Sequence, residues 1–444
     1  MSETVLRPLG EPGDTSAHRT IPARPVARRR RRRRRAPVRR FLVVTHRWSA
    51  LLLGLVLVVV CTSGAALVYE PEIVRTSHSE LFHSTPSVVP VGFDTAFAAV
   101  RAADPDFATS YASLKDGVYL VFSDDPASNQ TYYVDAGTGR VNGHEDVFGG
   151  VIGFLVNLHD CGLTCQAYPG YLPWLDSPSV IAGVPWFADM TWGAVVLGGT
   201  GLLLLFLAVG GIVLWWPGIR RWRQGFRVRL GKGRFARDYD LHNVIGIVAA
   251  PALLVWALTG MNFEIPEVSK IWYAATGGVA PADDAYTMES SGTGPQVDVA
   301  TASSAAVQRF PHASVTAVSM PTESTPYYTI TLFDRGPDGS NADLWANDPT
   351  YSGNRYVGVD AHDASHVSVM EGPPTTVSNT IIDNWAQPVL HYGVAVGPWW
   401  RSVWFAFGLT PLALMLTGVS TWVFRRQTAR AKKKARAARA AAAA

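Results

Sequence analysis

Long apolar stretches alternate with long polar ones along this 444-residue chain. The apolar stretches cover residues 42–69, 190–216, 242–263 and 399–424. Each is long enough for a helix of about 20 residues, the length that a bilayer requires. The pattern predicts an α-helical integral membrane bundle with four transmembrane helices. Hydrophobic residues make up 48% of the chain and charged residues 17%, which agrees with a membrane protein that also has sizeable polar parts.

The two long connections between these spans follow one plan. Each has a helical pattern followed by about three strand-like stretches, with Gly, Asp and Asn turns between them. We therefore expect one small α+β unit in each connection, and a duplicated chain of the form span, outer unit, histidine, span. The helical patterns lie at 94–105 and 298–311, and the strand-like stretches at 110–122, 131–141, 314–320, 327–333 and 355–367.

Basic and acidic residues lie on different connections. The connection 217–241 and the tail from Arg425 carry eight Lys/Arg residues each. The connections 70–189 and 263–385 each hold four basic residues against fifteen acidic ones. By the positive-inside rule, both termini and the connection 217–241 are cytoplasmic, and the two acidic connections lie outside. The sequence thus predicts a multi-pass membrane protein with both termini on the cytoplasmic side.

Eight consecutive arginines, Arg28 to Arg35, precede the first span. Such blocks also bind nucleic acid. Beside a membrane helix, we interpret the block as a topology anchor that contacts anionic lipid, with no nucleic-acid partner. The apolar stretch that follows is too long for a cleaved signal peptide.

The patterns divide the chain into ten successive parts. They are residues 1–40 (disordered basic N-terminus), 41–69 (first span), 70–150 (first outer unit), 151–189 (outer histidine-bearing segment and loop), 190–216 (second span), 217–241 (basic loop), 242–263 (third span), 264–383 (second outer unit), 384–424 (histidine-bearing helix and fourth span) and 425–444 (basic tail).

The chain has three cysteines. Cys61 lies inside the first span, where a small apolar role is expected. Cys161 and Cys165 lie in the outer stretch DCGLTC, where a disulfide is chemically permitted. A catalytic dithiol is the alternative there, and the sequence does not decide between the two.

Four histidines occupy matching positions in the two halves of the chain. His46 and His242 stand at the inner ends of the first and third spans; we call them the first pair. His159 and His391 follow the two outer units; we call them the second pair. A single interfacial histidine also caps a helix or meets lipid headgroups. Two pairs, one on each predicted side, instead indicate two haem groups, each with two imidazoles as axial ligands of its iron.

Glycines accompany these histidines. Gly64 and Gly260 each lie 18 residues after the histidine that begins their span. At about 100° per residue, 18 residues return to the same helix face. Gly211 and Gly418 lie near the inner ends of the returning spans. A flat porphyrin needs helix faces without side chains, so we expect Gly211 and Gly418 beside the first pair, and Gly64 and Gly260 beside the second. Packing between membrane helices is the alternative reason for glycine.

Other polar side chains are weaker candidates. Asp238 and Asp240 precede His242, and either accept an imidazole N–H or cap the start of the helix, with capping favoured for Asp240. The remaining outer histidines have no strong ligand spacing, and four glutamates follow the outward spans, where they either line a haem or mark the interface. These residues are His78, His83, His144, His312, His362, His366, Glu70, Glu72, Glu264 and Glu267.

Together, these motifs resemble the PepSY-associated transmembrane family, over roughly residues 40–426. In YYVDAGTGRV, the residues Tyr133, Asp135, Gly137 and Gly139 stand in the order of the second half of a PepSY unit. RYVGVDAHDASHV is a looser match. The motifs that carry the resemblance are HRWSALLLGLVLVVVCTSG, YYVDAGTGRV, the NLHD around His159, WWPGIRRWR, DYDLHNVIG, RYVGVD and LHYG.

The resemblance implies four membrane helices, two PepSY-like outer units and b-type haem held non-covalently by membrane histidines. For some members it implies reduction of a ferric siderophore on the periplasmic side. The sequence contains no CxxCH, which agrees with b-type haem. It also contains no Gly-rich nucleotide fingerprint, so we expect electrons from a quinol or a separate cytoplasmic donor. The basic connection 217–241 either docks an acidic donor or only sets topology.

Three functions compete at this stage. The leading one is a haem b electron-transfer protein that acts as a ferric-siderophore oxidoreductase, with no catalytic residue identified. In the second, PepSY-like units regulate an extracellular protease or sense the envelope, and the helices are anchors. The third is a transporter subunit, for which the sequence offers no broken helix or buried acidic pair.

Overall fold

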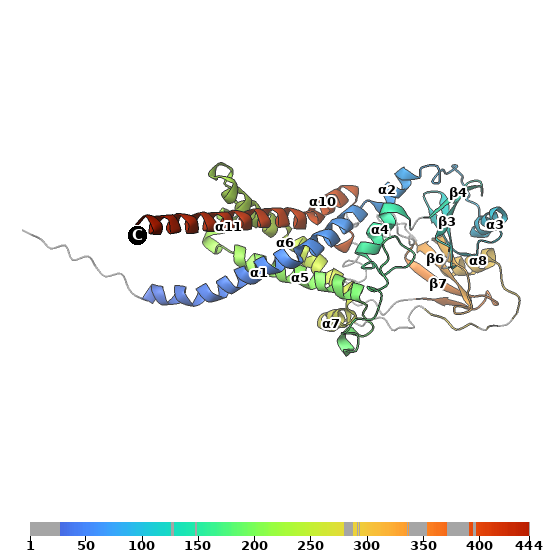
Figure 1. The fold of residues 1–444 in the computed structure, drawn as a ribbon. Coiled ribbons are helices and arrows are strands. Elements are labelled where there is room, and N and C mark those ends of the chain that lie inside the picture. The colour runs from blue at the N-terminus through green and yellow to red at the C-terminus, as the bar shows by residue number, and fades with distance from the viewer. Residues whose placement is uncertain are drawn as a thin grey trace, which may run out of the picture. The chain divides into compact units, whose positions relative to one another are not determined.

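The computed structural model of this chain describes residues 27–125, 128–146, 149–278, 287–290, 292, 294–334, 336, 353–370, 390–393 and 397–443 (Figure 1). The chain divides into two compact units, residues 1–45 and 46–444. In the first unit, the described part is the beginning of helix α1 (Ala27–Leu67). The second unit contains the remaining elements.

Four described helical segments are long and apolar enough to cross a membrane, and each coincides with one of the predicted spans. They lie in α1, in α5 (Trp192–Trp215), in α6 (Arg234–Glu264), and in α10 (Pro398–Gly408) together with α11 (Thr410–Ala443). The fourth span is interrupted at Leu409, and Pro411 follows in the first turn of α11. Proline has no backbone N–H and is tolerated in a first turn, so the interruption falls where the sequence allows it.

The start of α1 differs from the prediction. Residues 1–40 were expected to be disordered; residues 1–26 lie outside the described residues, and the helix already begins at Ala27. The arginine block is therefore part of a helix. Arginine has a high helix propensity, so the block can continue the apolar helix towards its N-terminus.

Helix α6 packs against α5 and α11. The core of this bundle contains Leu57 from α1, Leu204 and Ala208 from α5, and Ala249, Leu253 and Ala257 from α6. Small residues bring the backbones together: a Cβ at Gly201 would lie 3.3 Å from the carbonyl oxygen of Ala257. This close approach is typical of membrane helices, which gain stability from packing rather than from the burial of apolar surface.

The outer units form one antiparallel sheet of eight strands. Its order is β4-β3-β2-β1-β5-β6-β7-β8, so the two halves meet where β1 pairs with β5. The sequence did not predict this shared sheet. The strands are β1 (Thr109–Lys115), β2 (Val118–Ser123), β3 (Gln130–Asp135), β4 (Val141–Asp146), β5 (Ala313–Ser319), β6 (Tyr327–Asp334), β7 (Arg355–Asp360) and β8 (Val367–Val369).

Helices α3 (Phe93–Ala103) and α8 (Val299–Arg309) pack on the sheet and on each other, as Figure 1 shows. Their positions confirm the two predicted helical patterns. Both helices share one core with strands from both halves, including Phe97, Val121, Ile330 and Val357. Since one core joins the halves, the sheet forms one layer and helices α3 and α8 form a second layer packed on it.

The predicted strand at 110–122 is wrong: this stretch forms a hairpin of two strands. Asp116 and Gly117 make its turn, with φ of 51° and 78°. Asp-Gly is the preferred pair for a two-residue hairpin turn, which needs positive φ at both positions. Elsewhere the structure adds α2 (Glu70–Ser77), α4 (Gly150–His159), α7 (Pro266–Thr276) and three short 3₁₀ segments, η1 (Pro185–Phe187), η2 (Ile219–Phe226) and η3 (Leu230–Lys232).

Candidate functional site

The structure brings the four predicted histidines together as two pairs. The ring centroids of His46 and His242 lie 6.5 Å apart, and their planes make an angle of 82°. The ring centroids of His159 and His391 lie 6.3 Å apart, at an angle of 44°. Residues separated by more than 190 positions in sequence thus face each other in both pairs.

The first pair lies between α1 and α6. His242 Nδ1 is 3.1 Å from the carbonyl oxygen of Leu414 and 3.1 Å from Thr417 Oγ1, both on α11. A carbonyl can only accept, so Nδ1 carries the proton and donates. His46 Nδ1 is different: it is buried and has no hydrogen-bond partner among the described residues.

In the second pair, His159 is the last residue of α4 and reaches α1. Its Nδ1 lies 2.8 Å from the carbonyl oxygen of Val60 and 3.4 Å from Ser63 Oγ. The imidazole lies directly against Gly64: a Cβ there would come within 2.6 Å of His159 Nε2. A side chain at position 64 would therefore displace the ring.

His391 is held by both its ring and its backbone. Its Nδ1 lies 2.7 Å from Thr259 Oγ1 on α6. Its carbonyl oxygen accepts hydrogen bonds from the indoles of Trp256 (3.1 Å) and Trp404 (2.9 Å). Gly393, at a φ of +75°, packs against the ring of Trp404, where no other residue would fit without strain. The histidine-bearing helix predicted from residue 384 lies outside the described residues up to residue 389.

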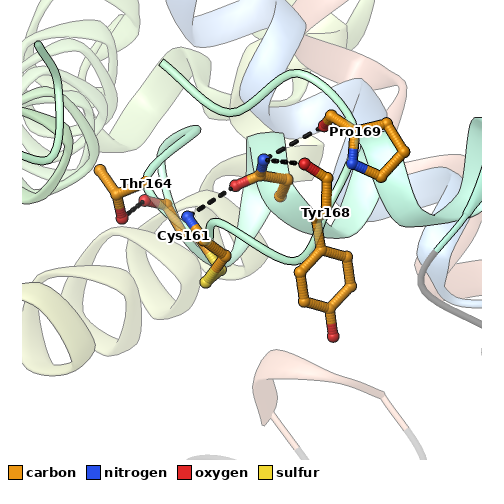
Figure 2. The surroundings of a disulfide bond; sticks show 6 residues. Cys161, Thr164, Tyr168 and Pro169 are labelled. Carbon is orange, nitrogen blue, oxygen red and sulfur yellow. Dashed lines mark hydrogen bonds between the residues drawn. A yellow bond between two sulfur atoms is a disulfide. The ribbon is translucent and has the colours of Figure 1, made fainter. Parts of the chain in front are cut away.

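A disulfide stabilises the loop that follows His159. Cys161 and Cys165 are bonded, with Cα atoms 5.7 Å apart, so the disulfide that the sequence permits is formed. Figure 2 shows the hydrogen bonds around it. Asn157, fully buried on α4, donates to the carbonyls of Tyr168 (3.3 Å) and Pro169 (3.1 Å) and accepts from Cys165 N (3.1 Å). These bonds tie the loop to the helix end that carries His159.

The glycines differ in their surroundings. A Cβ at Gly211 would lie 3.7 Å from His46, and one at Gly418 would lie 3.5 Å from His242, so both border the first pair. Gly64 borders His159. A Cβ at Gly260 would have no atom of the described residues within 4 Å. Gly210, which the sequence analysis did not single out, also faces His46, at 3.6 Å from Nδ1.

The centroid distances of both imidazole pairs are compatible with two ligands of one metal ion. With metal–nitrogen bonds of about 2 Å, two such rings have centroids roughly 6 Å apart. Each ring can rotate about its metal–nitrogen bond, so different interplanar angles are compatible with this arrangement. Where Nδ1 donates to a carbonyl, Nε2 keeps the lone pair that a metal requires. Two protein nitrogens per site suit an iron whose other ligands come from a porphyrin.

Several weaker candidates have other roles. The prediction that Asp240 caps a helix is wrong, because α6 begins at Arg234 and Asp240 lies inside it. Asp240 instead forms a two-bond ion pair with Arg229, at 2.7 and 2.8 Å. Asp238 accepts hydrogen bonds from Arg237 and Ser420 rather than from His242. Burial would raise the pKa of Glu72, but hydrogen bonds from Arg401 on α10 outweigh it and lower that pKa.

Three of the six other outer histidines contact polar side chains of the same chain. His78 lies 2.6 Å from Glu145, His144 lies 2.8 Å from Gln130, and His366 lies 3.5 Å from Asp360. In the part of the chain that the structure describes, no three His, Cys, Asp or Glu side chains gather as a metal-binding group.

Four apolar helices, a shared antiparallel sheet and two histidine pairs define a multi-pass membrane protein with a large polar domain. A family model described as "PepSY-associated TM region" matches residues 43–425, and the chain belongs to this family. The eight-stranded antiparallel sheet fits PepSY-like units. No curated protein matches the chain in sequence.

Sequence reasoning missed the residues that hold the histidines. Thr259, Thr417 and Ser63 contact the imidazoles, and each stands directly before one of the predicted glycines. This hydroxyl–glycine pattern was visible in the sequence and was overlooked. Trp256 and Trp404 had no local signal, because tryptophan is common near membrane surfaces for other reasons.

Proposed function

We propose that this protein is a haem b electron-transfer protein of the bacterial plasma membrane. In this proposal, one haem lies between His46 and His242 and another between His159 and His391. The observation that carries the proposal is the facing of two imidazole pairs at centroid distances of 6.5 and 6.3 Å. Membership of the PepSY-associated family and the four apolar helices support the membrane setting.

When bound, a six-coordinate haem supplies a reversible one-electron carrier with no open position for oxygen. The chain's own residues keep the imidazoles in place. Carbonyl oxygens of Val60 and Leu414 accept the Nδ1 protons and leave Nε2 free to bind a metal. Glycines beside three of the rings keep those helix faces free of side chains.

The direction of transfer follows from the predicted topology. The basic connection 217–241 and both termini are cytoplasmic in the proposal, and the sheet lies outside. A quinol or a cytoplasmic donor delivers electrons near the first pair, and an extracytoplasmic acceptor receives them near the second. Resemblance to ferric-siderophore reductases suggests a chelated ferric ion as that acceptor. The matching halves suggest a gene duplication.

Absorption spectra of the purified protein, before and after dithionite reduction, test the proposal. We expect about two b-type haems per chain. His46→Ala or His242→Ala should remove one haem, and His159→Ala or His391→Ala the other. His312→Ala, an exposed histidine outside both pairs, is the matched control and should keep both haems. Reduced protein should then be mixed with a panel of ferric chelates to identify acceptors.

A colourless protein after expression with haem supplementation would refute the proposal. In that case, the sheet would be better explained as a regulatory or sensing domain anchored by the helices. Full haem content in all four histidine variants would show that the haem ligands lie elsewhere.

A further inference from the structure

Three of the four candidate glycines follow a hydroxyl-bearing residue. The dipeptides are Ser63–Gly64, Thr259–Gly260 and Thr417–Gly418. In each, the hydroxyl lies within hydrogen-bond distance of the Nδ1 of one histidine. The distances are 3.4 Å from Ser63 to His159, 2.7 Å from Thr259 to His391 and 3.1 Å from Thr417 to His242.

The hydroxyl protons are already used within the helices. Ser63 Oγ donates to Val60 O at 2.8 Å, Thr259 Oγ1 to Val255 O at 2.8 Å, and Thr417 Oγ1 to Ala413 O at 2.8 Å. A hydroxyl has one proton, so an oxygen that donates to its helix carbonyl accepts from the imidazole. Each contact therefore fixes the proton on Nδ1 and leaves the lone pair on Nε2.

The hydroxyl matters most for His391. Carbonyl oxygens also accept from Nδ1 of His159 and His242, at 2.8 and 3.1 Å. For His391, Thr259 is the one Nδ1 partner found among the described residues. Thr259 is itself buried, at 3% exposure, so water does not readily replace it.

The fourth position breaks the pattern. On α5 the corresponding dipeptide is Gly210–Gly211, with no hydroxyl. A Cβ at Gly210 would lie 3.6 Å from His46 Nδ1, an ordinary contact distance. That Nδ1 is buried and, alone among the four paired histidines, has no hydrogen-bond partner in the described part of the chain. A serine at this position would bring its oxygen within reach of the ring.

We infer that Thr259 is a positioning residue that sets the tautomer of His391, and that Gly210 leaves His46 as the one imidazole of the four whose tautomer no neighbour among the described residues fixes. The two sites are thus chemically unequal. The consequence for haem rests on the proposed function; the consequence for the tautomers does not.

Nitrogen NMR of protein labelled with ¹⁵N-histidine, prepared without haem, tests the tautomers directly. Thr259→Val should remove the Nδ1–H form of one histidine, and Thr259→Ser should restore it. Gly210→Ser should add one Nδ1–H signal that disappears when combined with His46→Ala. Thr200→Val is the matched control, because Thr200 is equally a buried threonine that donates to a carbonyl, at 2.7 Å, and contacts no histidine.

Haem-loaded protein gives a second readout. A hydrogen-bond acceptor at Nδ1 makes the imidazole more basic and favours the oxidised metal. Thr259→Val should therefore raise the midpoint potential of one haem and weaken its binding by about 10- to 100-fold. Gly210→Ser should lower the potential of the other haem. Thr417→Val and Ser63→Ala should change these quantities less, since carbonyls back up those hydroxyls.

The two proposals fail in different ways. If no variant binds haem but the tautomers respond as described, the proposed function is wrong and the positioning role stands. If Thr259→Val leaves the tautomer of His391 unchanged, the positioning role is overturned even in a protein with two haems. If Gly210→Ser leaves the histidine Nδ1–H signals unchanged, the proposed chemical difference between the two histidine pairs is overturned.

Discussion

Gly64 and Gly260 occupy matching positions in the sequence, yet they have different surroundings. A Cβ at Gly64 would overlap the imidazole of His159, whereas a Cβ at Gly260 would meet no atom of the described residues within 4 Å. Helical spacing places a glycine on a face. It does not state what packs on that face, because the neighbour comes from a distant part of the chain.

Alanine substitutions at these two glycines should therefore act in opposite directions. Overpacking at Gly64→Ala should cost about 1–3 kcal/mol, which exceeds the gain in helix propensity. Gly260→Ala should be neutral or stabilising by up to about 1 kcal/mol. Thermal unfolding of the detergent-solubilised protein, prepared without haem, measures both. Equal destabilisation by the two variants would contradict the packing described for His159.

At the residue scale, the sequence was sufficient to group the four histidines into the two pairs whose rings lie close together. It did not supply their hydrogen-bond partners. Val60 and Leu414 act through backbone carbonyls, which any residue offers, so their side chains give no signal. Their contribution depends on which helix faces which, and that follows from tertiary packing.

Among the elements, the turn after β3 shows how a short motif becomes a structural constraint. Asp135, at 1% exposure, accepts hydrogen bonds from Thr85 N (3.0 Å), Thr85 Oγ1 (2.6 Å) and Gly137 N (2.8 Å). Burial alone would raise the pKa of Asp135. The hydrogen bonds outweigh burial and lower that pKa to about 2 from a reference of 3.8. The carboxylate thus joins the turn to the segment before α3.

This lowered pKa predicts an acid-sensitive turn. The folded state binds a proton less readily than the unfolded state, so the stabilisation is complete above pH 3.8 and is lost as pH falls through about 2. Hydrogen exchange at the amides of β3 and β4 should accelerate over that window. Asp135→Asn should lose about 1–3 kcal/mol at neutral pH and show a flatter acid profile. An unchanged acid profile in Asp135→Asn would assign the sensitivity to another carboxyl group.

Element types were predictable where periodicity extended over many residues, as in α3, α8 and the four spans. Short elements were less so. The helix α4 was missed because its ten residues, GVIGFLVNLH, are almost uniformly apolar and contain two glycines. Such a stretch has no polar face to reveal a helical period. The hairpin at Asp116–Gly117 was missed although its turn signal was present.

For the whole molecule, the joining of the two outer units was beyond the sequence pattern. The units meet through three residue pairs: Tyr111 with Ser319, Ala112 with Val318 and Ser113 with Ala317. Alternation along a strand indicates which face is buried, but it does not name the strand's neighbour. Pairing β1 with β5 also removes two exposed edges from the centre of the sheet, which otherwise invite association with other chains.

The charge distribution makes a prediction about the whole molecule's orientation. Exposed Gln224 lies in the basic segment η2, exposed Ala438 in the basic tail, and exposed Ser324 between β5 and β6. Single cysteines at these positions, in a Cys61→Ala background with the disulfide intact, can be tested with a membrane-impermeant thiol reagent. Ser324→Cys should react from outside the plasma membrane of spheroplasts. Gln224→Cys and Ala438→Cys should react only after the membrane is permeabilised.

This expected orientation follows because Lys and Arg near the ends of a span are retained on the cytoplasmic side. The segment η2 supplies an independent check, because Ile219 and Trp222 are 80% and 47% exposed among its arginines. Such a mixture suits the surface of an anionic leaflet, which agrees with a cytoplasmic position of η2. Labelling of Ser324→Cys and Gln224→Cys from the same side would exclude an odd number of crossings between them, and so the single crossing by α6. Electrons could then not travel from the first pair to the second across a membrane, whatever the haem content of the protein.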